Sequence, residues 1–294
     1  MLVTIFYHVD EFCKVFEATL KAKSISEDNQ KIIRRTCSLS LSEIITICVY
    51  YHYSGYKNFK SYYEKQVLVY MKSDFRSLVS YSRFIELKSE AIMPMLLFLK
   101  IYCAACTGWS IIDSFSLKVC HNRRIHSHKV FKNLAKRGKT SVGWFYGFKV
   151  HFIINNFGEI IDFYITSGNV ADNNTNLLEI LTRNIFGKLF GDKGYLVNSS
   201  FFQLLYENGI HLITKIRKNM KNSLMDISDK LFLRKRGTVE SCIGILKTDF
   251  EIEHTRHRSP ANFLCHVLST LIAYFFRPTK PSIARSGIPI EGFV

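Results

Sequence analysis

Apolar residues recur at helical spacing through the first third of the chain, over residues 10–99. Sequences that commonly begin helices punctuate this pattern, as in Ser40-Leu41-Ser42-Glu43, where a serine precedes a glutamate by three positions. The spacing predicts an all-helical domain over residues 1–105.

Beyond Trp109 the apolar runs shorten to the length of strands. The first covers residues 110–117, and residues 146–154 and 159–166 form a predicted hairpin. Later runs predict strands at 188–192 and 210–214 and helices at 173–185, 199–208, 235–250 and 260–276. Three early strands followed by alternating helices and strands predict an α/β fold over residues 106–294, with a mixed sheet flanked by helices.

The composition suits a globular protein with a basic surface. Of the 294 residues, 47% are hydrophobic, which is enough to fill a core. The 40 Lys and Arg against 24 Asp and Glu give a formal charge of +16, which favours a polyanionic partner. Nucleic acid is the first such partner to consider, and an anionic membrane surface is the second.

The apolar stretches are too short or too interrupted to span a membrane. Residues 91–109 include Pro94 and Lys100, and residues 263–276 fall short of the roughly 20 that a span needs. The N-terminus has no basic lead-in to an apolar run, so we expect no signal peptide and a cytoplasmic protein.

Eight cysteines occur, mostly in apolar surroundings typical of reduced, buried thiols. One spacing is compatible with a zinc site, because Cys103 and Cys106 are two residues apart and Cys120 and His121 follow. The apolar run around the first pair favours core packing over zinc.

Three acids lie where a catalytic site of carboxylates would need them. Asp113 follows apolar residues inside a predicted strand, where an ionised carboxylate is costly to bury without a partner or a metal ion. Asp192 ends another strand, between Gly191 and Gly194, where the backbone can approach other atoms closely. Glu240 is on a predicted helix, so the three acids come from separate elements, as phosphodiester cleavage by two metal ions requires.

The helix that carries Glu240 places basic residues beside it. Arg236 and Lys247 lie about 40° and about 20° from Glu240 around the helix axis, so the three share one face. Taken singly, such residues are more often caps and surface salt bridges. Asp162 and Asp172 are rival acids, and we expect Asp172 to cap the following helix.

Basic residues surround these acids in the sequence. No acid occurs between Asp113 and Glu159, whereas nine Lys and Arg do. Such runs often form only a solvated surface, but here they favour contacts with phosphates. The residues that we expect to bind DNA are Arg123, Lys136, Arg137, Lys139, Lys149, Lys193, Lys215, Arg217, Lys218, Arg236, Lys247, Arg256 and Arg258.

Two further groups have open interpretations. Among the basic residues, Trp144, Phe145 and Tyr146 suit stacking on a base or packing in the core, and we favour the core. The N-terminal region suits a DNA-binding module or an ordinary helical domain with a solvated surface. Its basic residues, which we expect to be exposed, are Lys57, Lys60, Lys65, Lys72, Arg76, Arg83 and Lys88.

Several segments resemble the DDE transposases of bacterial insertion sequences, and most closely the insertion-sequence family nine-eight-two. They include Ile112-Asp113-Ser114-Phe115, Phe190-Gly191-Asp192-Lys193-Gly194-Tyr195, Gly143-Trp144-Phe145-Tyr146-Gly147-Phe148-Lys149 and Glu253-His254-Thr255-Arg256-His257-Arg258-Ser259. The resemblance implies an RNase H-like catalytic domain with Asp113, Asp192 and Glu240 as its three acids. The 47 residues between the last two (240 − 192 − 1) are similar to the family's spacing.

Two positions depart from what the resemblance leads us to expect. Leu233 stands three residues before Arg236, where a broader transposase group usually has Tyr, so no role of that Tyr is carried over. Ser167 stands where we expect Pro before Gly-Asn, a change that should affect only a loop.

The resemblance also implies an activity and its partners. It implies cleavage of double-stranded DNA at terminal inverted repeats and transfer of the 3′-OH ends into target DNA, with two Mg²⁺ ions, or Mn²⁺, held by the three acids. It further implies a homodimer or larger oligomer on DNA, in the bacterial cytoplasm and with the nucleoid. The alternatives are a catalytically inactive DNA-binding protein and an RNase H-like nuclease that cuts without joining.

Overall fold

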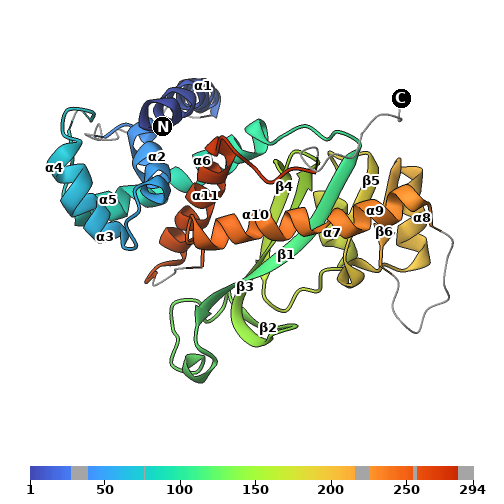
Figure 1. Ribbon diagram of the computed structural model, residues 1–294. Coiled ribbons are helices and arrows are strands. Elements are labelled where there is room, and N and C mark those ends of the chain that lie inside the picture. Colours follow the sequence, from blue (N-terminus) through green and yellow to red (C-terminus); the bar gives the residue numbers. More distant parts are fainter. Residues whose placement is uncertain (28–38, 76, 216–224, 254–256, 284–294) are drawn as a thin grey trace. The chain divides into compact units, whose positions relative to one another are not determined.

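The computed structural model describes residues 1–27, 39–75, 77–215, 225–253 and 257–283 (Figure 1). The chain forms two compact units. Unit 1 contains Met1–Tyr102 and Thr248–Phe276, and unit 2 contains Cys103–Lys247 and Arg277–Val294. The sequence predicted one boundary near residue 105, whereas the chain in fact crosses between the units three times.

Unit 1 is helical, as predicted for the N-terminal region. Its helices are α1 (Leu2–Glu27), α2 (Leu41–Tyr50), α3 (Phe59–Tyr62), α4 (Leu68–Tyr70), α5 (Tyr81–Leu87), α6 (Ile92–Tyr102) and α11 (Pro260–Phe276), with short turns η1 (Tyr51–Tyr53), η2 (Tyr63–Val67) and η3 (Lys88–Ala91). The Ser40–Glu43 capping box predicted from the sequence begins α2.

The late helix α11 packs against the early helices of unit 1. His52 hydrogen-bonds with the Ser269 hydroxyl at 2.9 Å, and the Tyr53 hydroxyl donates to the Ala273 carbonyl. Residues Val267, Leu268, Leu271 and Ile272 of this helix are buried. The core of unit 1 is therefore built from both ends of the chain.

One basic residue of unit 1 differs from the prediction. Lys88, expected to be exposed, is only 3% exposed, and its ammonium lies 4.3 Å from the centre of the Phe59 ring. A lysine can bury its aliphatic stem and direct its charge at an aromatic face, which the sequence pattern does not reveal.

Unit 2 contains a six-stranded mixed sheet, which confirms the predicted fold class. Its strands are β1 (Trp109–Cys120), β2 (Lys136–Thr140), β3 (Gly143–Asn155), β4 (Ile160–Ser167), β5 (Gly187–Gly191) and β6 (Ile210–Thr214). The order is β2-β3-β1-β5-β6, and β4 also pairs with β3. β1 is central, antiparallel to β3 and parallel to β5.

Helices cover both faces of this sheet. Ile112 and Leu189 pack with Leu177 of α7 (Thr175–Leu181) and Leu205 of α8 (Ser199–Glu207) in one buried cluster. The neighbouring positions point to the opposite face, because side chains alternate along a strand. There the Trp109 ring contacts Phe190 of β5 and Phe232 of α9.

The helix predicted over residues 235–250 is α10 (Gly237–Thr248), and a further helix that was not predicted, α9 (Ile227–Lys235), precedes it. Arg236 stands at the break with helical dihedral angles. In Figure 1 α10 crosses β1, the central strand of unit 2. None of the helices in the described ranges is long and apolar enough to cross a membrane.

Candidate active site

Asp113 and Asp192 come from adjacent parallel strands. Ile111 of β1 is paired with Phe190 of β5, and continuing this register by two residues brings Asp113 beside Asp192, just beyond the end of β5. Adjacent strands are about 4.8 Å apart, so the sheet itself holds the two acids close together.

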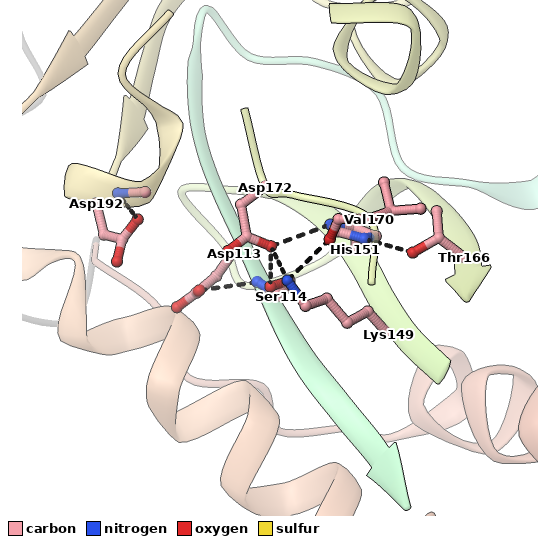
Figure 2. Close-up of polar contacts among 9 residues, drawn as sticks. Asp113, Ser114, Lys149, His151, Thr166, Val170, Asp172 and Asp192 are labelled. Carbon is pink, nitrogen blue, oxygen red and sulfur yellow. Dashed lines mark hydrogen bonds and ion pairs between the residues drawn. The ribbon is translucent and has the colours of Figure 1, made fainter. Parts of the chain in front are cut away.

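Backbone amides orient both carboxylates. Asp113 Oδ1 accepts a hydrogen bond from the Ser114 amide at 2.8 Å, and Asp192 Oδ1 accepts one from the Gly194 amide at 2.7 Å (Figure 2). A side chain at Gly194 would bring its Cβ to 2.8 Å from Asp192 Oδ1. At Gly194 the prediction is confirmed, because the absence of a side chain lets this backbone approach the Asp192 carboxylate.

Arg236 joins the third acid to the first. Its Nη1 lies 3.3 Å from Asp113 Oδ2, and its Nη2 lies 3.2 Å from Glu240 Oε1. The Arg236 and Asp113 side chains are largely buried, at 16% and 17% exposed, whereas that of Glu240 is 64% exposed. Glu240 is thus tied to the site through Arg236, on the outer side of the cluster.

The gathered charges change the acidity of Asp113. Burial raises its pKa to about 6. The Ser114 amide and the Arg236 guanidinium oppose this rise, while Asp192 and Glu240 add to it. Asp192 and Glu240 therefore both act electrostatically on Asp113, and a cation bound among the three would offset this repulsion.

Lys247 lies on the same side of β1 as Asp113. Its ammonium is 5.7 Å from the centre of the Phe115 ring, and Phe115 is two residues after Asp113 on the strand. The face predicted to contain Arg236, Glu240 and Lys247 therefore points at β1, although Arg236 precedes α10.

A fourth acid, Asp172, lies close to this site but makes a different set of contacts (Figure 2). Its Oδ1 accepts from the Ser114 hydroxyl at 2.8 Å and from the Lys149 ammonium at 3.1 Å, and Lys149 also donates to the Val170 carbonyl. Asp172 was expected to cap α7, but the N-cap of that helix is Asn174.

His151 completes the group around Asp172. The ring is buried, and burial lowers its pKa to about 4, so the imidazole is neutral at physiological pH. Its Nε2 hydrogen-bonds with the Thr166 hydroxyl at 2.9 Å, and its Nδ1 lies 3.7 Å from Asp172 Oδ1, beyond hydrogen-bond range.

Tyr195 is buried and interacts electrostatically with both groups of acids. Burial raises the pKa of its phenol well above the ordinary value, and Asp172, Asp113 and Asp192 raise it further. Sequence reasoning identified Asp172 only as a rival acid and did not single out Tyr195 or His151.

The predicted DNA-binding residues divide by exposure. Lys149 is buried and engaged by Asp172, so its charge is not presented to solvent. The residues that lie outside the described ranges are Arg217, Lys218 and Arg256. Those that are exposed are Arg123, Lys136, Arg137, Lys139, Lys193, Lys215 and Arg258, the last of which belongs to unit 1.

The cysteine and histidine set considered for zinc is not brought together. In the part of the chain that the structure describes, no three His, Cys, Asp or Glu side chains lie close enough to hold a metal ion. Cys106 instead accepts from the Phe186 amide, and His121 accepts from the Arg123 amide at the start of a short turn.

The same finding bears on the three acids. As arranged here, they do not form a closed set of ligands, because Glu240 is bound to Arg236. Their chemistry still fits a hard divalent cation, which prefers carboxylate oxygens. The acidic neighbours also raise the pKa of Asp113, and a bound cation would stabilise the ionised form of its carboxylate.

Comparison with known families now identifies the domain. The family model described as "Transposase DDE domain" matches residues 103–260, which is 158 of the 294 residues (260 − 103 + 1). No curated protein matches the chain. The matched segment contains all three acids and the six strands that the structure describes in unit 2. The match confirms the resemblance to DDE transposases and the RNase H-like fold class, and the finer likeness to family nine-eight-two stays a prediction. The chain therefore belongs to the family of transposase DDE domains.

Proposed function

We propose that this transposase cuts double-stranded DNA at the terminal inverted repeats of an insertion sequence and transfers the 3′-OH ends into target DNA. The observation that carries the proposal is the meeting of Asp113 and Asp192 on adjacent parallel strands, with Arg236 joining Glu240 to Asp113. Such a cluster, beside exposed basic residues, suits phosphodiester chemistry.

DDE transposase domains generally use divalent metal ions, and in our proposal Asp113, Asp192 and Glu240 hold two Mg²⁺ or Mn²⁺ ions. Metal bound there would activate the attacking oxygen and stabilise the departing 3′ oxygen. Asp113 and Asp192 provide the fixed part of the site, because the β1–β5 ladder sets their spacing. Glu240 is exposed and must leave Arg236 to join them.

Arg236 has two roles in this proposal. In the structure it partly neutralises Asp113 and Glu240, which reduces the repulsion between these two acids. Once released, its guanidinium can donate two parallel hydrogen bonds to two oxygens of one phosphate group.

The exposed basic residues of unit 2 would hold the DNA backbone. Lys193 directly follows Asp192, and Lys215 follows the end of β6, which lies next to β5. Both are exposed and close in sequence to the carboxyl ends of these strands. We propose that the protein acts as a homodimer or larger oligomer on DNA, in the cytoplasm and with the nucleoid.

The test compares Asp113→Asn with the wild-type protein on DNA that carries the element's ends. We expect Asp113→Asn to abolish cleavage and strand transfer while binding of the ends is preserved. The variant should fold, because burial disfavours the charged form of Asp113 and asparagine has nearly the same shape. Mg²⁺ or Mn²⁺ should raise the melting temperature of the wild type more than that of the variant.

Glu179→Gln is the matched control, since it removes an exposed carboxylate from α7 on the opposite face of the sheet. It should cut and join as the wild type does. Cleavage by Asp113→Asn at the wild-type rate would refute the assignment. Nicking of a target plasmid without joining of a supplied 3′-OH end would indicate a nuclease, and binding without any chemistry would indicate a DNA-binding protein.

A further inference from the structure

The hairpin of β2 and β3 presents an exposed tryptophan between two cations. Of the three neighbouring aromatic residues, Phe145 and Tyr146 are buried, at 2% and 7% exposed, whereas Trp144 is 54% exposed. The Arg137 guanidinium carbon lies 5.4 Å from the centre of the Trp144 ring, and the Lys139 ammonium lies 5.6 Å from it. Trp144 is therefore at the surface, whereas the two aromatic residues that follow it are in the core.

The pairing of the two strands creates this arrangement. Lys139 is the direct cross-strand partner of Trp144, and Arg137 is the partner of Tyr146, so all four side chains share one face of the hairpin. The β3 end of the hairpin is anchored, because the Asn122 side-chain amide donates to the Trp144 carbonyl at 2.7 Å. The indole is therefore presented from a defined backbone position.

Within the part of the chain that the structure describes, no acid forms an ion pair with the cations around the indole. The ion pairs found among the described residues do not include Arg137 or Lys139. The chain itself contains no acid between Asp113 and Glu159. The hairpin is thus an uncompensated positive surface with an aromatic face at its centre.

This combination fits one class of partner better than others. An exposed tryptophan is by itself ordinary, and basic residues by themselves would suit any polyanion. A flat aromatic ring between phosphate-binding cations fits a nucleotide whose base is unstacked, because the bases inside a duplex already cover one another. Such bases occur at frayed or overhanging ends, where the proposed cleavage takes place.

We propose that Trp144 stacks on an unpaired base near a DNA end, with Arg137 and Lys139 holding the flanking phosphates. The inference rests on the proposed function for its DNA partner and goes beyond it in naming the form of DNA. Stacking on an aromatic side chain contributes about 1–3 kcal/mol per base. That range corresponds to about five- to 150-fold in affinity.

The experiment measures binding of the full-length protein, in EDTA to prevent cleavage, to three DNA probes by fluorescence anisotropy. The probes are a blunt duplex, the same duplex with an unpaired overhang, and that overhang with abasic sites, which keep the phosphates and remove the bases. We expect the wild type to prefer the overhang over its abasic form by about five-fold or more.

The variants separate stacking from charge. Trp144→Ala should lose the preference and Trp144→Phe should retain most of it. Arg137→Gln with Lys139→Gln should weaken binding of all three probes and reduce the salt dependence. Heparin, a polyanion without bases, should bind wild type and Trp144→Ala equally.

Tryptophan fluorescence gives a second measurement. The chain contains two tryptophans, and Trp109 is buried against Phe190 and Phe232. In Trp109→Phe the signal therefore comes from Trp144 alone, and the overhang should quench it more than the abasic probe does.

The outcomes separate this inference from the proposed function. If Trp144→Ala keeps the full preference for the overhang, or if its heparin affinity falls as much as its overhang affinity, the stacking role is wrong while DNA binding stands. If the wild type binds the blunt duplex but shows no preference, the inference fails alone. If it binds none of the DNA probes, the proposed function fails as well.

Discussion

The ion pair between Lys149 and Asp172 lies inside unit 2, and removing its carboxylate should destabilise the fold. The Lys149 side chain is 9% exposed and that of Asp172 is 29% exposed. Asp172→Ala leaves the Lys149 ammonium with the Val170 carbonyl as its acceptor and removes the acceptor of the Ser114 hydroxyl. An ammonium left unpaired in the interior is costly.

The magnitude follows from burial. Removing one partner of a fully buried ion pair costs about 3–5 kcal/mol. Because water reaches part of Asp172, we expect about 2–3 kcal/mol for Asp172→Ala. Asp172→Asn keeps an acceptor for both donors and should cost about half as much. A change of 1 kcal/mol shifts the melting temperature of a unit this size by about 2–4 °C.

The assay is thermal and urea unfolding of the full-length protein, followed by circular dichroism. The double variant Lys149→Met with Asp172→Leu is the decisive comparison, since it removes both charges and leaves none unpaired. It should be more stable than Asp172→Ala. The reasoning is refuted if Asp172→Ala unfolds within about 0.5 kcal/mol of the wild type, or if the double variant is no more stable than the single one.

Two other predictions concern the interior of unit 2. Burial lowers the pKa of the His151 imidazole to about 4, whereas its value in the unfolded chain is 6.5. Below pH 6.5 the unfolded state therefore binds more protons than the folded state, and the free energy of unfolding should fall as the pH decreases from about 6.5 to about 4. His151→Gln should remove part of that fall, measured by urea unfolding across this pH range, and an unchanged profile would contradict the assignment. A Cβ at Gly147 would lie 1.9 Å from the Leu117 carbonyl oxygen, so Gly147→Ala should lower the free energy of unfolding by more than about 2 kcal/mol. Gly244→Ala, where a Cβ meets no atom within 4 Å on a helix, should be neutral or stabilising by up to about 1 kcal/mol; equal effects at the two glycines would show that the clash is not the cause.

The central features of unit 2 could be predicted because they depend on local pattern. The apolar run around Asp113 and the glycines flanking Asp192 indicated strands and close backbone approach, and both acids lie in or just after a strand. The hydrophobic periodicity also predicted α11 over the bounds that it has.

Other features depend on partners distant in sequence, which no local pattern contains. β2 was missed because Lys136-Arg137-Gly138-Lys139-Thr140 has no apolar alternation; it is a strand because β3 pairs with it. The sequence around Lys149 predicts a surface cation, because its partner Asp172 is 23 residues away in the chain. The break between α9 and α10 at Arg236 likewise could not be predicted from helical periodicity. At this position the guanidinium lies between Asp113 and Glu240.

Unit 1 draws its core from two separated parts of the chain, and this has a genetic consequence. α11 contributes buried residues such as Val267, Leu271 and Tyr274 to a unit that otherwise consists of residues 1–102 and the short stretch before this helix. A premature stop codon after α10 and before residue 260 would leave the six described strands and all three acids encoded, but would remove α11 from the core of the helical unit. Such truncations should therefore behave as folding defects and not as transposases that lack only a C-terminal tail.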